Sequence, residues 1–411
     1  MATSVTFHVP GAVLTEREHT VPLDHANPGA GTITVFTREV AAPDGLDRPY
    51  LVFLQGGPGF EAARPTSPLT GWMKRAVEEY RVLLVDQRGT GRSTPVGSTI
   101  PGDTARAQAD YLAHFRADSI VRDCEAIRAE LGSPPWTTLG QSFGGFTTLT
   151  YLSFAPEGLA ASLLTGGLSP VGRPVDDIYG ATYRQAIAAN GRYFYRYPGD
   201  RARVREIFAR LEDEDVRLPG GDRLTARRFR QLGMWLGDSA GFELLHHVIE
   251  LPFGSNAFLT DVEHAAPWPR NPIYATLHES SYADGVPTRW SADRLLPDEI
   301  VAEGLFTAEH VFPWMWEDFG GLHGHREAAM LLAEHPWPRL YDADRLARNE
   351  VPVVGTIYTN DVYVERAFAV ETAALVRGLR SWETNEYEHN GLRADGERVV
   401  GRLIDMVKGR S

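Results

Sequence analysis

The residues with the clearest chemistry lie in Trp136-Thr137-Thr138-Leu139-Gly140-Gln141-Ser142-Phe143-Gly144-Gly145. Within this stretch, residues 140–144 fit the pattern G-x-S-x-G, in which a serine stands at the tip of a strained strand-to-helix turn. Glycines flank the serine because neighbouring chain must come close on both sides, where a Cβ atom would clash. The next helix points its first amides and its dipole at the serine, which favours negative charge there. Ser142 is therefore a candidate nucleophile.

The surrounding sequence predicts the elements that such a turn requires. Residues 137–139 favour a strand, and residues 146–154 favour an apolar helix that ends at Pro156. A bare match in a glycine-rich chain is also compatible with an ordinary turn. The strand before the serine and the helix after it favour the nucleophile.

A serine hydroxyl needs a base to remove its proton, and the base needs an orienting carboxylate. In α/β-hydrolases these residues follow the order Ser, then Asp or Glu, then His. Asp361 comes directly after the predicted strand 353–359, and of the 13 histidines only His389 lies beyond the last predicted pair of strands. Asp361 is also compatible with a helix N-cap. The order favours a Ser142–Asp361–His389 triad.

An acyl-transfer site also needs donors for the oxyanion. The pattern places one at the amide after the nucleophile, Phe143, and one in the loop after an earlier strand. Residues 56–59, Gly-Gly-Pro-Gly, follow such a strand, and the Gly57 amide is the best candidate there. A tight turn at Pro58-Gly59 is compatible with this role.

Apolar strands that alternate with helices predict an α/β fold with a mostly parallel, doubly wound sheet. The three glycine-rich loops follow Leu54, Val85 and Leu139, so they meet beyond the carboxyl ends of the strands, where ligands bind in such sheets. Short strands in hairpins are expected before residue 40. A helix over 362–379, a last strand near 382–387 and a helix over 397–408 are expected at the other end.

Between residues 175 and 341 the chain is rich in Arg, Glu and aromatic residues at helical spacing, as in 201–211 and 224–236. We expect a helical cap domain over 175–341, inserted into a catalytic domain formed by 1–174 and 342–411. Such a cap would lie over the site.

Composition excludes several classes of function. The 411 residues carry a net charge of −13, which argues against nucleic acid as the main partner. No stretch approaches the roughly 18 apolar residues of a membrane span, and the first ten residues do not form a signal peptide. We therefore expect a cytoplasmic protein. Its one cysteine, Cys124, favours a buried apolar role.

Two partial motifs for cofactors are weak. Gly89-x-Gly91 lacks the third glycine of a dinucleotide loop. His278-Glu279-Ser280-Ser281-Tyr282 has tyrosine where a zinc protease has its second histidine, and His323-Gly324-His325 is too small a cluster for a metal. We expect neither a metal nor an organic cofactor.

Five segments together resemble the proline iminopeptidases (prolyl aminopeptidases), a group of α/β-hydrolases. They are Gly56-Gly57-Pro58-Gly59, Asp86-Gln87-Arg88-Gly89-Thr90-Gly91-Arg92-Ser93, residues 140–145, Asp361-Val362-Tyr363-Val364 and His389-Asn390-Gly391-Leu392-Arg393. The second segment is the most specific. One departure is Gln55, where the family often has histidine; it leaves the amide donors of the loop in place.

The resemblance implies that the partner is a peptide with a free N-terminal proline and that cap glutamates bind its amine. Glu279 and Glu309 lie in the two cap segments that look similar. A buried carboxylate needs a partner, which the substrate cation supplies. Phe312 and Trp314 could wall the proline ring. A solvated surface role for the glutamates and core packing for the aromatic residues remain open, as does the oligomeric state.

Two other functions are compatible with the same residues. The chain could be an esterase or amidase that acts on a small non-peptide substrate, because this fold hosts many chemistries. It could also be a binding protein with an inactive site, which the intact order of Ser142, Asp361 and His389 disfavours.

Overall fold

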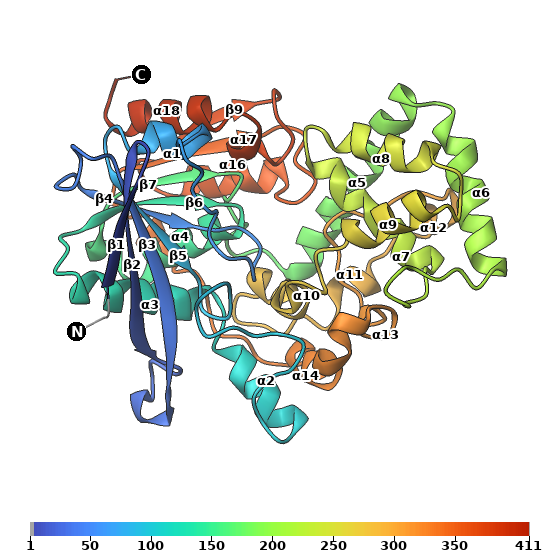
Figure 1. Ribbon diagram of the computed structural model, residues 1–411, viewed down its shortest axis with the longest axis horizontal. Helices are drawn as coiled ribbons and strands as arrows, with labels where there is room; N and C mark the ends of the chain where they lie inside the picture. Colours follow the sequence, from blue (N-terminus) through green and yellow to red (C-terminus); the bar gives the residue numbers. More distant parts are fainter. Residues whose placement is uncertain (1–3, 411) are drawn as a thin grey trace.

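The computed structural model describes residues 4–410, and within them the strands form one nine-stranded sheet (Figure 1). The strand order is β1-β2-β3-β5-β4-β6-β7-β8-β9. The pairs from β5 to β9 are parallel, and the pairs from β1 to β5 are antiparallel. This confirms the predicted α/β class and the mostly parallel sheet. The strands are Ser4–Val9, Ala12–Pro22, Thr32–Ala41, Tyr50–Leu54, Arg81–Asp86, Trp136–Gln141, Leu159–Thr165, Val353–Tyr358 and Arg380–Thr384.

The central strands of the sheet are buried on both faces, as the apolar run of β4 predicts. In β4, Val52 and Leu54 pack into one hydrophobic cluster, and Leu51 and Phe53 into the other. Side chains of α3, α4 and α16 cover the first face, and those of α1 and α18 cover the second. These helices are α1 Gly71–Ala76, α3 Ala117–Glu130, α4 Phe143–Phe154, α16 Arg366–Leu375 and α18 Gly396–Val407.

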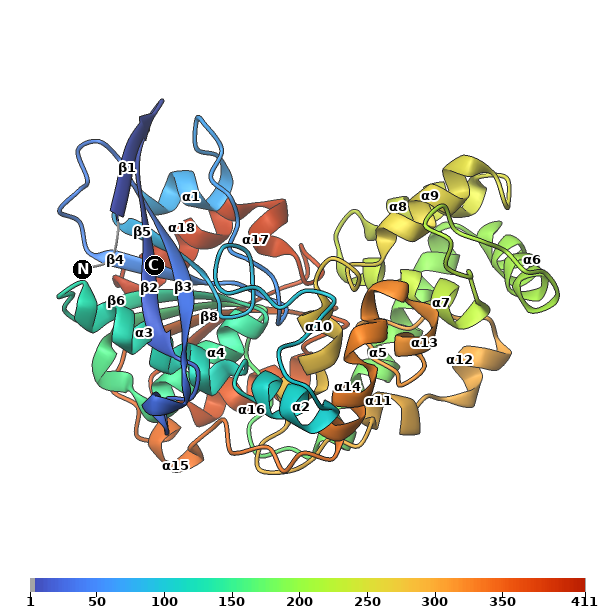
Figure 2. The ribbon, with the colours of Figure 1, turned by 60° about the horizontal axis from the view of Figure 1, so that its bottom comes forward.

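Helices between β7 and β8 form a second body beside the sheet, seen at the right of Figures 1 and 2. A hydrophobic cluster formed mostly by this body includes Phe229, Leu236 and Phe306, together with Val362 from the segment after β8. Its elements include α5 Val175–Arg196, α6 Asp200–Asp213, α7 Ala226–Arg230, η3 Gln231–Gly237, α8 Gly241–Glu250, α9 Asn256–Ala265, α10 Pro272–Leu277, η4 Glu279–Tyr282, α11 Ser291–Arg294, α12 Asp298–Ala302, α13 Met315–Asp318, η5 Gly320–His325 and α14 Arg326–Ala333. We call the segment 175–341 the cap.

The remaining helices lie outside the cap, in the connections between strands and helices of the first part. They are η1 Pro28–Ala30, α2 Ala105–Ala113, η2 Pro156–Gly158, α15 Ala343–Leu346 and α17 Gly391–Ala394. The chain after the Gly89–Gly91 turn is irregular until α2 begins, so no helix N-terminus follows that turn as a dinucleotide loop requires.

Some predicted boundaries are wrong. The helix expected over 362–379 begins at Arg366, because Glu365 caps it by accepting a hydrogen bond from the Phe368 amide. The last strand ends at Thr384 instead of residue 387. The helix expected over 224–236 is divided into α7 and the 3-10 helix η3. Strand β1 was not predicted.

Candidate active site

Ser142 stands at the turn between β6 and α4, beyond the carboxyl end of the sheet. Its backbone has φ 52° and ψ −123°, a conformation that is strained for a residue with a side chain. The Ser142 amide donates to the Thr165 carbonyl at 3.0 Å, which ties the turn to β7. The serine side chain is only partly buried, whereas the residues on both sides are buried. The turn therefore exposes one side chain in an otherwise closed region.

The glycines of the elbow are explained by close contacts of the main chain. A Cβ atom at Gly144 would overlap the carbonyl oxygen of Leu54 in β4. A Cβ atom at Gly140 would overlap the carbonyl oxygen of Gly144 itself. The helix α4 can therefore start directly against the sheet, which brings its N-terminus to Ser142.

Asp361 and His389 meet beyond the ends of β8 and β9. Oδ2 of Asp361 lies 2.6 Å from Nδ1 of His389, and the two residues are 1% and 5% exposed. Oδ1 of Asp361 accepts from the amides of Tyr363 and Val364 at 2.8 and 2.9 Å. Because the carboxylate only accepts, Nδ1 carries the proton and Nε2 is left as the basic nitrogen. The alternative role of Asp361 as a helix N-cap is wrong, because the N-cap residue of α16 is Glu365.

The turn after β7 lies beside both the imidazole of His389 and the main chain of Ser142. A Cβ atom at Gly166 would lie 3.2 Å from Nδ1 and Cε1 of His389. A Cβ atom at the next residue, Gly167, would lie 2.6 Å from the carbonyl oxygen of Ser142. Two adjacent glycines thus contact the histidine ring and the serine backbone.

The amides of Gly57 and Phe143 flank the serine. A Cβ atom at Gly56 would lie 3.0 Å from Cβ and 3.7 Å from Oγ of Ser142, so the loop after β4 passes directly beside the hydroxyl. Within residues 4–410, neither the Gly57 amide nor the Phe143 amide donates a hydrogen bond to a protein atom. Phe143 is the first residue of α4, where amides have no partner inside the helix. Both amides are available to a ligand oxygen.

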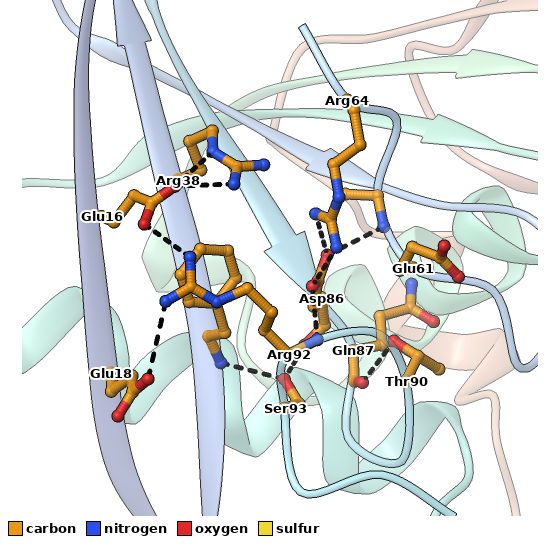
Figure 3. A network of polar contacts seen from close by, with 12 residues as sticks. Glu16, Glu18, Arg38, Glu61, Arg64, Asp86, Gln87, Thr90, Arg92 and Ser93 are labelled. Carbon is orange, nitrogen blue, oxygen red and sulfur yellow. Dashed lines mark hydrogen bonds and ion pairs between the residues drawn. The ribbon is translucent and has the colours of Figure 1, made fainter. Parts of the chain in front are cut away.

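The segment 86–93 supports this loop. Oδ1 and Oδ2 of Asp86 accept from Arg64 at 2.9 and 2.8 Å, and Oδ1 also accepts from the Ala62 amide at 3.1 Å (Figure 3). The side-chain amide of Gln87 donates to the main-chain carbonyl of Gln55 at 3.1 Å. Both ends of the loop that carries Gly57 are therefore held by side chains at the end of β5. This gives the most specific segment of the sequence a physical role.

Glu309 borders the same region from the cap. Its Oε1 accepts from the Tyr274 hydroxyl, and its Oε2 lies 3.3 Å from Nε2 of His278. Burial, together with the negative charge of Asp361, raises the pKa of Glu309 well above its usual value. The Tyr274 ring packs 4.8 Å from Phe60, which directly follows Gly59. Glu309 therefore lies near both the acid of the triad and the loop beside Ser142.

Comparison with known proteins identifies the family. Residues 49–217 match the model of the alpha/beta hydrolase fold. A proline iminopeptidase of Aeromonas sobria is 48% identical over 403 residues, which cover 94% of this chain and 95% of that protein. The proline iminopeptidase aneH of Aspergillus aculeatus is 34% identical, with 95% and 92% covered. The chain belongs to the proline iminopeptidase family. It is a hydrolase with the α/β-hydrolase fold.

In this member of the proline iminopeptidase family, the second predicted amine ligand, Glu279, has a different environment. Its Oε1 accepts from the Ala292 amide at 2.9 Å, at the start of α11. The side chain is buried, and its Oε2 has no hydrogen-bond partner within the described residues. Burial raises the pKa of Glu279 to about 7. Glu279 is thus directed at the cap interior, whereas Glu309 borders the triad.

The aromatic residues predicted to wall the pocket pack against each other. The rings of Phe312 and Trp314 stack with centroids 5.4 Å apart, and the Arg227 guanidinium lies 4.9 Å from the Trp314 ring. Phe312 is 2% exposed and belongs to a cluster of cap residues. Other aromatic side chains lie nearer the triad.

Sequence analysis missed two of these. Tyr363 packs its ring 4.9 Å from His389 at 80°, and Phe60 contacts Tyr274 beside the loop of Gly57. Tyr363 lies within the recognised segment 361–364 but was given no role there, and Phe60 directly follows the segment 56–59. That proximity was the available signal.

The described part of the chain contains no group of three or more metal-binding side chains that could hold an ion, and none of its helices is long and apolar enough to cross a membrane. His325 of the His323-Gly324-His325 segment is instead buried, with Nε2 2.7 Å from the Gly97 carbonyl and Nδ1 3.0 Å from the Thr276 hydroxyl. Cys124 is buried in the core, as predicted.

Proposed function

We propose that this chain is a serine aminopeptidase that releases proline from the N-terminus of peptides through an acyl-enzyme. The observation that carries the proposal is the full-length similarity to the Aeromonas sobria proline iminopeptidase. The elbow at Ser142 and the hydrogen bond between Asp361 and His389 support it from the geometry.

In the proposed reaction, Oγ of Ser142 attacks the carbonyl carbon of the N-terminal proline. Nε2 of His389 takes the hydroxyl proton and gives it to the leaving amine as the peptide bond breaks. Asp361 keeps the imidazole oriented and stabilises its positive charge. The amides of Gly57 and Phe143 bind the oxyanion, and water, activated by the same histidine, then hydrolyses the prolyl ester.

The cap supplies the specificity in this proposal. The carboxylate of Glu309 binds the cationic imino group of the substrate, and Glu279, the second predicted ligand, adds negative charge to the cap when it is ionised. Phe312 and Trp314 form part of the wall around the ring. Fixing the free amine at one distance from Ser142 excludes internal peptide bonds and blocked N-termini. A cytoplasmic location, and a peptide rather than a nucleic acid or a membrane as partner, remain predictions.

A panel of aryl-amides tests the proposal. Prolyl aryl-amide should be hydrolysed much faster than alanyl aryl-amide, and N-acetylprolyl aryl-amide should not be hydrolysed. Ser142→Ala should abolish turnover while the circular dichroism spectrum is retained. Equal rates for the free and the acetylated substrate would refute the aminopeptidase. Fast cleavage of simple acyl esters, unchanged in Glu279→Gln and Glu309→Gln, would instead establish the esterase alternative.

A further inference from the structure

We propose that Ser239 of the cap is a positioning residue for His389, so that the cap holds the catalytic base in place. This inference rests on the proposed function, in which His389 is that base. The cap segment involved is 237–239, which runs from the last residue of η3 into the turn before α8. The segment that it holds is 388–390, the loop that carries His389 between β9 and α17.

The cap binds the main chain of the histidine directly. The His389 amide donates to the Gly237 carbonyl at 2.8 Å. On the opposite side, the imidazole Nδ1 is held by Asp361 at 2.6 Å. The backbone of the base is therefore held by the cap and its ring by the residue after β8.

Ser239 binds both neighbours of His389. Its amide and hydroxyl donate to Oδ1 of Asn390 at 3.0 and 2.7 Å, and its hydroxyl accepts from the Glu388 amide at 3.5 Å. Asn390 is 5% exposed, so its amide oxygen depends on these two donors. One cap serine therefore binds the residues on both sides of His389.

The same part of the cap also contacts the acid loop. The Tyr363 hydroxyl donates to the Met234 carbonyl in η3, and the Tyr363 ring lies against His389. A Cβ atom at Gly237 would overlap the Tyr363 ring, so only glycine allows this approach. The cap segment therefore contacts the main chain of His389 directly and supports Tyr363, whose ring packs against the imidazole.

These contacts matter because proton transfer depends steeply on geometry. A misplacement of about 1 Å can cost on the order of 10²-fold in rate. Removing the Ser239 hydroxyl leaves the backbone hydrogen bonds in place, so we expect about a tenfold fall in kcat. KM should stay the same, since Ser239 does not touch the groups proposed to bind substrate.

The experiment compares Ser239→Ala, Ser239→Thr, Asn390→Ala and the double variant Ser239→Ala/Asn390→Ala. The control is Ser255→Ala, which removes another cap hydroxyl, the N-cap of α9, away from the base. The rate of Ser142 labelling by a fluorophosphonate, kcat and KM for prolyl aryl-amide, and the urea midpoint are measured for each.

We expect slower labelling and lower kcat in Ser239→Ala, and recovery in Ser239→Thr. The loss in the double variant should be smaller than the two single losses combined, since the hydrogen bond between the Ser239 hydroxyl and Asn390 is removed in both. Wild-type labelling and kcat in Ser239→Ala, or losses that track only the urea midpoint as in Ser255→Ala, would overturn the inference. Fully additive losses would overturn it too.

Labelling separates this inference from the proposed specificity, because the fluorophosphonate needs the triad but no N-terminal proline. If wild-type protein is labelled at Ser142 yet does not cleave prolyl aryl-amide, the proposed substrate is wrong and the labelling comparison still decides the role of Ser239. If wild-type Ser142 is not labelled, both proposals are wrong.

Discussion

Oε2 of Glu309 lies 3.3 Å from Nε2 of His278, and the two groups are buried together beside the triad. Burial lowers the pKa of His278 to about 3, so its ring is neutral near pH 7. The Tyr179 hydroxyl lies 3.1 Å from Nδ1 of the same ring. Tyr274 and His278 thus hold the carboxylate without bringing any charge. The raised pKa of Glu309 favours the protonated acid in the empty site, and a substrate imino cation would favour the carboxylate by pairing with it.

Replacing Glu309 with Gln keeps the shape of the site and removes the group that can ionise to pair with the imino cation. Hydrogen bonds to charged groups contribute about 1.5–3 kcal/mol, so kcat/KM for prolyl aryl-amide should fall by about 10- to 100-fold, mainly through KM. Fluorophosphonate labelling of Ser142 should be unchanged. The control is Glu334→Gln, an exposed cap glutamate. An unchanged KM would exclude Glu309 as the amine ligand.

Asp361→Asn should lower kcat by about 10³- to 10⁴-fold, because an amide in place of the carboxylate no longer fixes the proton on Nδ1 of His389. KM and the urea midpoint should change little. Steady-state kinetics with prolyl aryl-amide measure this effect. Glu365→Gln, at the N-cap of the helix that follows, is the matched control and should retain most activity. Comparable losses in the two variants would contradict a special role for Asp361.

Glu279 should make the stability of the protein depend on pH. Its pKa rises from 4.5 to about 7 on folding, chiefly through burial. The folded state therefore binds the proton more tightly, and the stability that this carboxyl contributes is lost as the pH rises from 4.5 to about 7. Glu279→Gln removes the loss, so its free energy of unfolding relative to wild type should increase by about 2–3 kcal/mol between pH 5 and pH 8.

Urea unfolding at the two pH values measures this difference. Glu299→Gln, an exposed change in the same cap, serves as the control and should show no such increase. A difference for Glu279→Gln that does not vary with pH would mean that the carboxyl is solvated in the folded protein.

Gly144→Ala should destabilise the protein by several kcal/mol and reduce activity by more than about 10²-fold, since its Cβ atom would overlap the Leu54 carbonyl and displace the elbow. Gly191→Ala is the matched change: Gly191 lies in α5 with open space around it, so alanine should stabilise the helix by up to about 1 kcal/mol. Thermal unfolding and kcat/KM distinguish the two. Normal activity in Gly144→Ala would contradict the close packing of α4 on β4.

The sequence by itself determined the features that depend on local sterics and chain order. The glycines at 140 and 144 imply a main chain that passes close to its neighbours, and the apolar runs at β4 and β5 imply strands buried on both faces. The order of Ser142, Asp361 and His389 selected one aspartate and one histidine, and the structure brings those two within 2.6 Å. The elbow and the strands could be predicted because each is encoded within a few residues, and the triad because chain order and the positions of the strand ends leave few candidates.

Only the tertiary structure decided how the cap meets this framework. No local pattern indicates that Glu279 turns toward α11 while Glu309 borders the triad, or that Phe312 stacks on Trp314. Ser239 and Asn390 are 151 residues apart, and their hydrogen bond forms only because the cap packs against the sheet. Side chains that meet across such separations are chosen by packing and by the need to pair buried polar groups, and neither requirement leaves a periodic signal in the sequence.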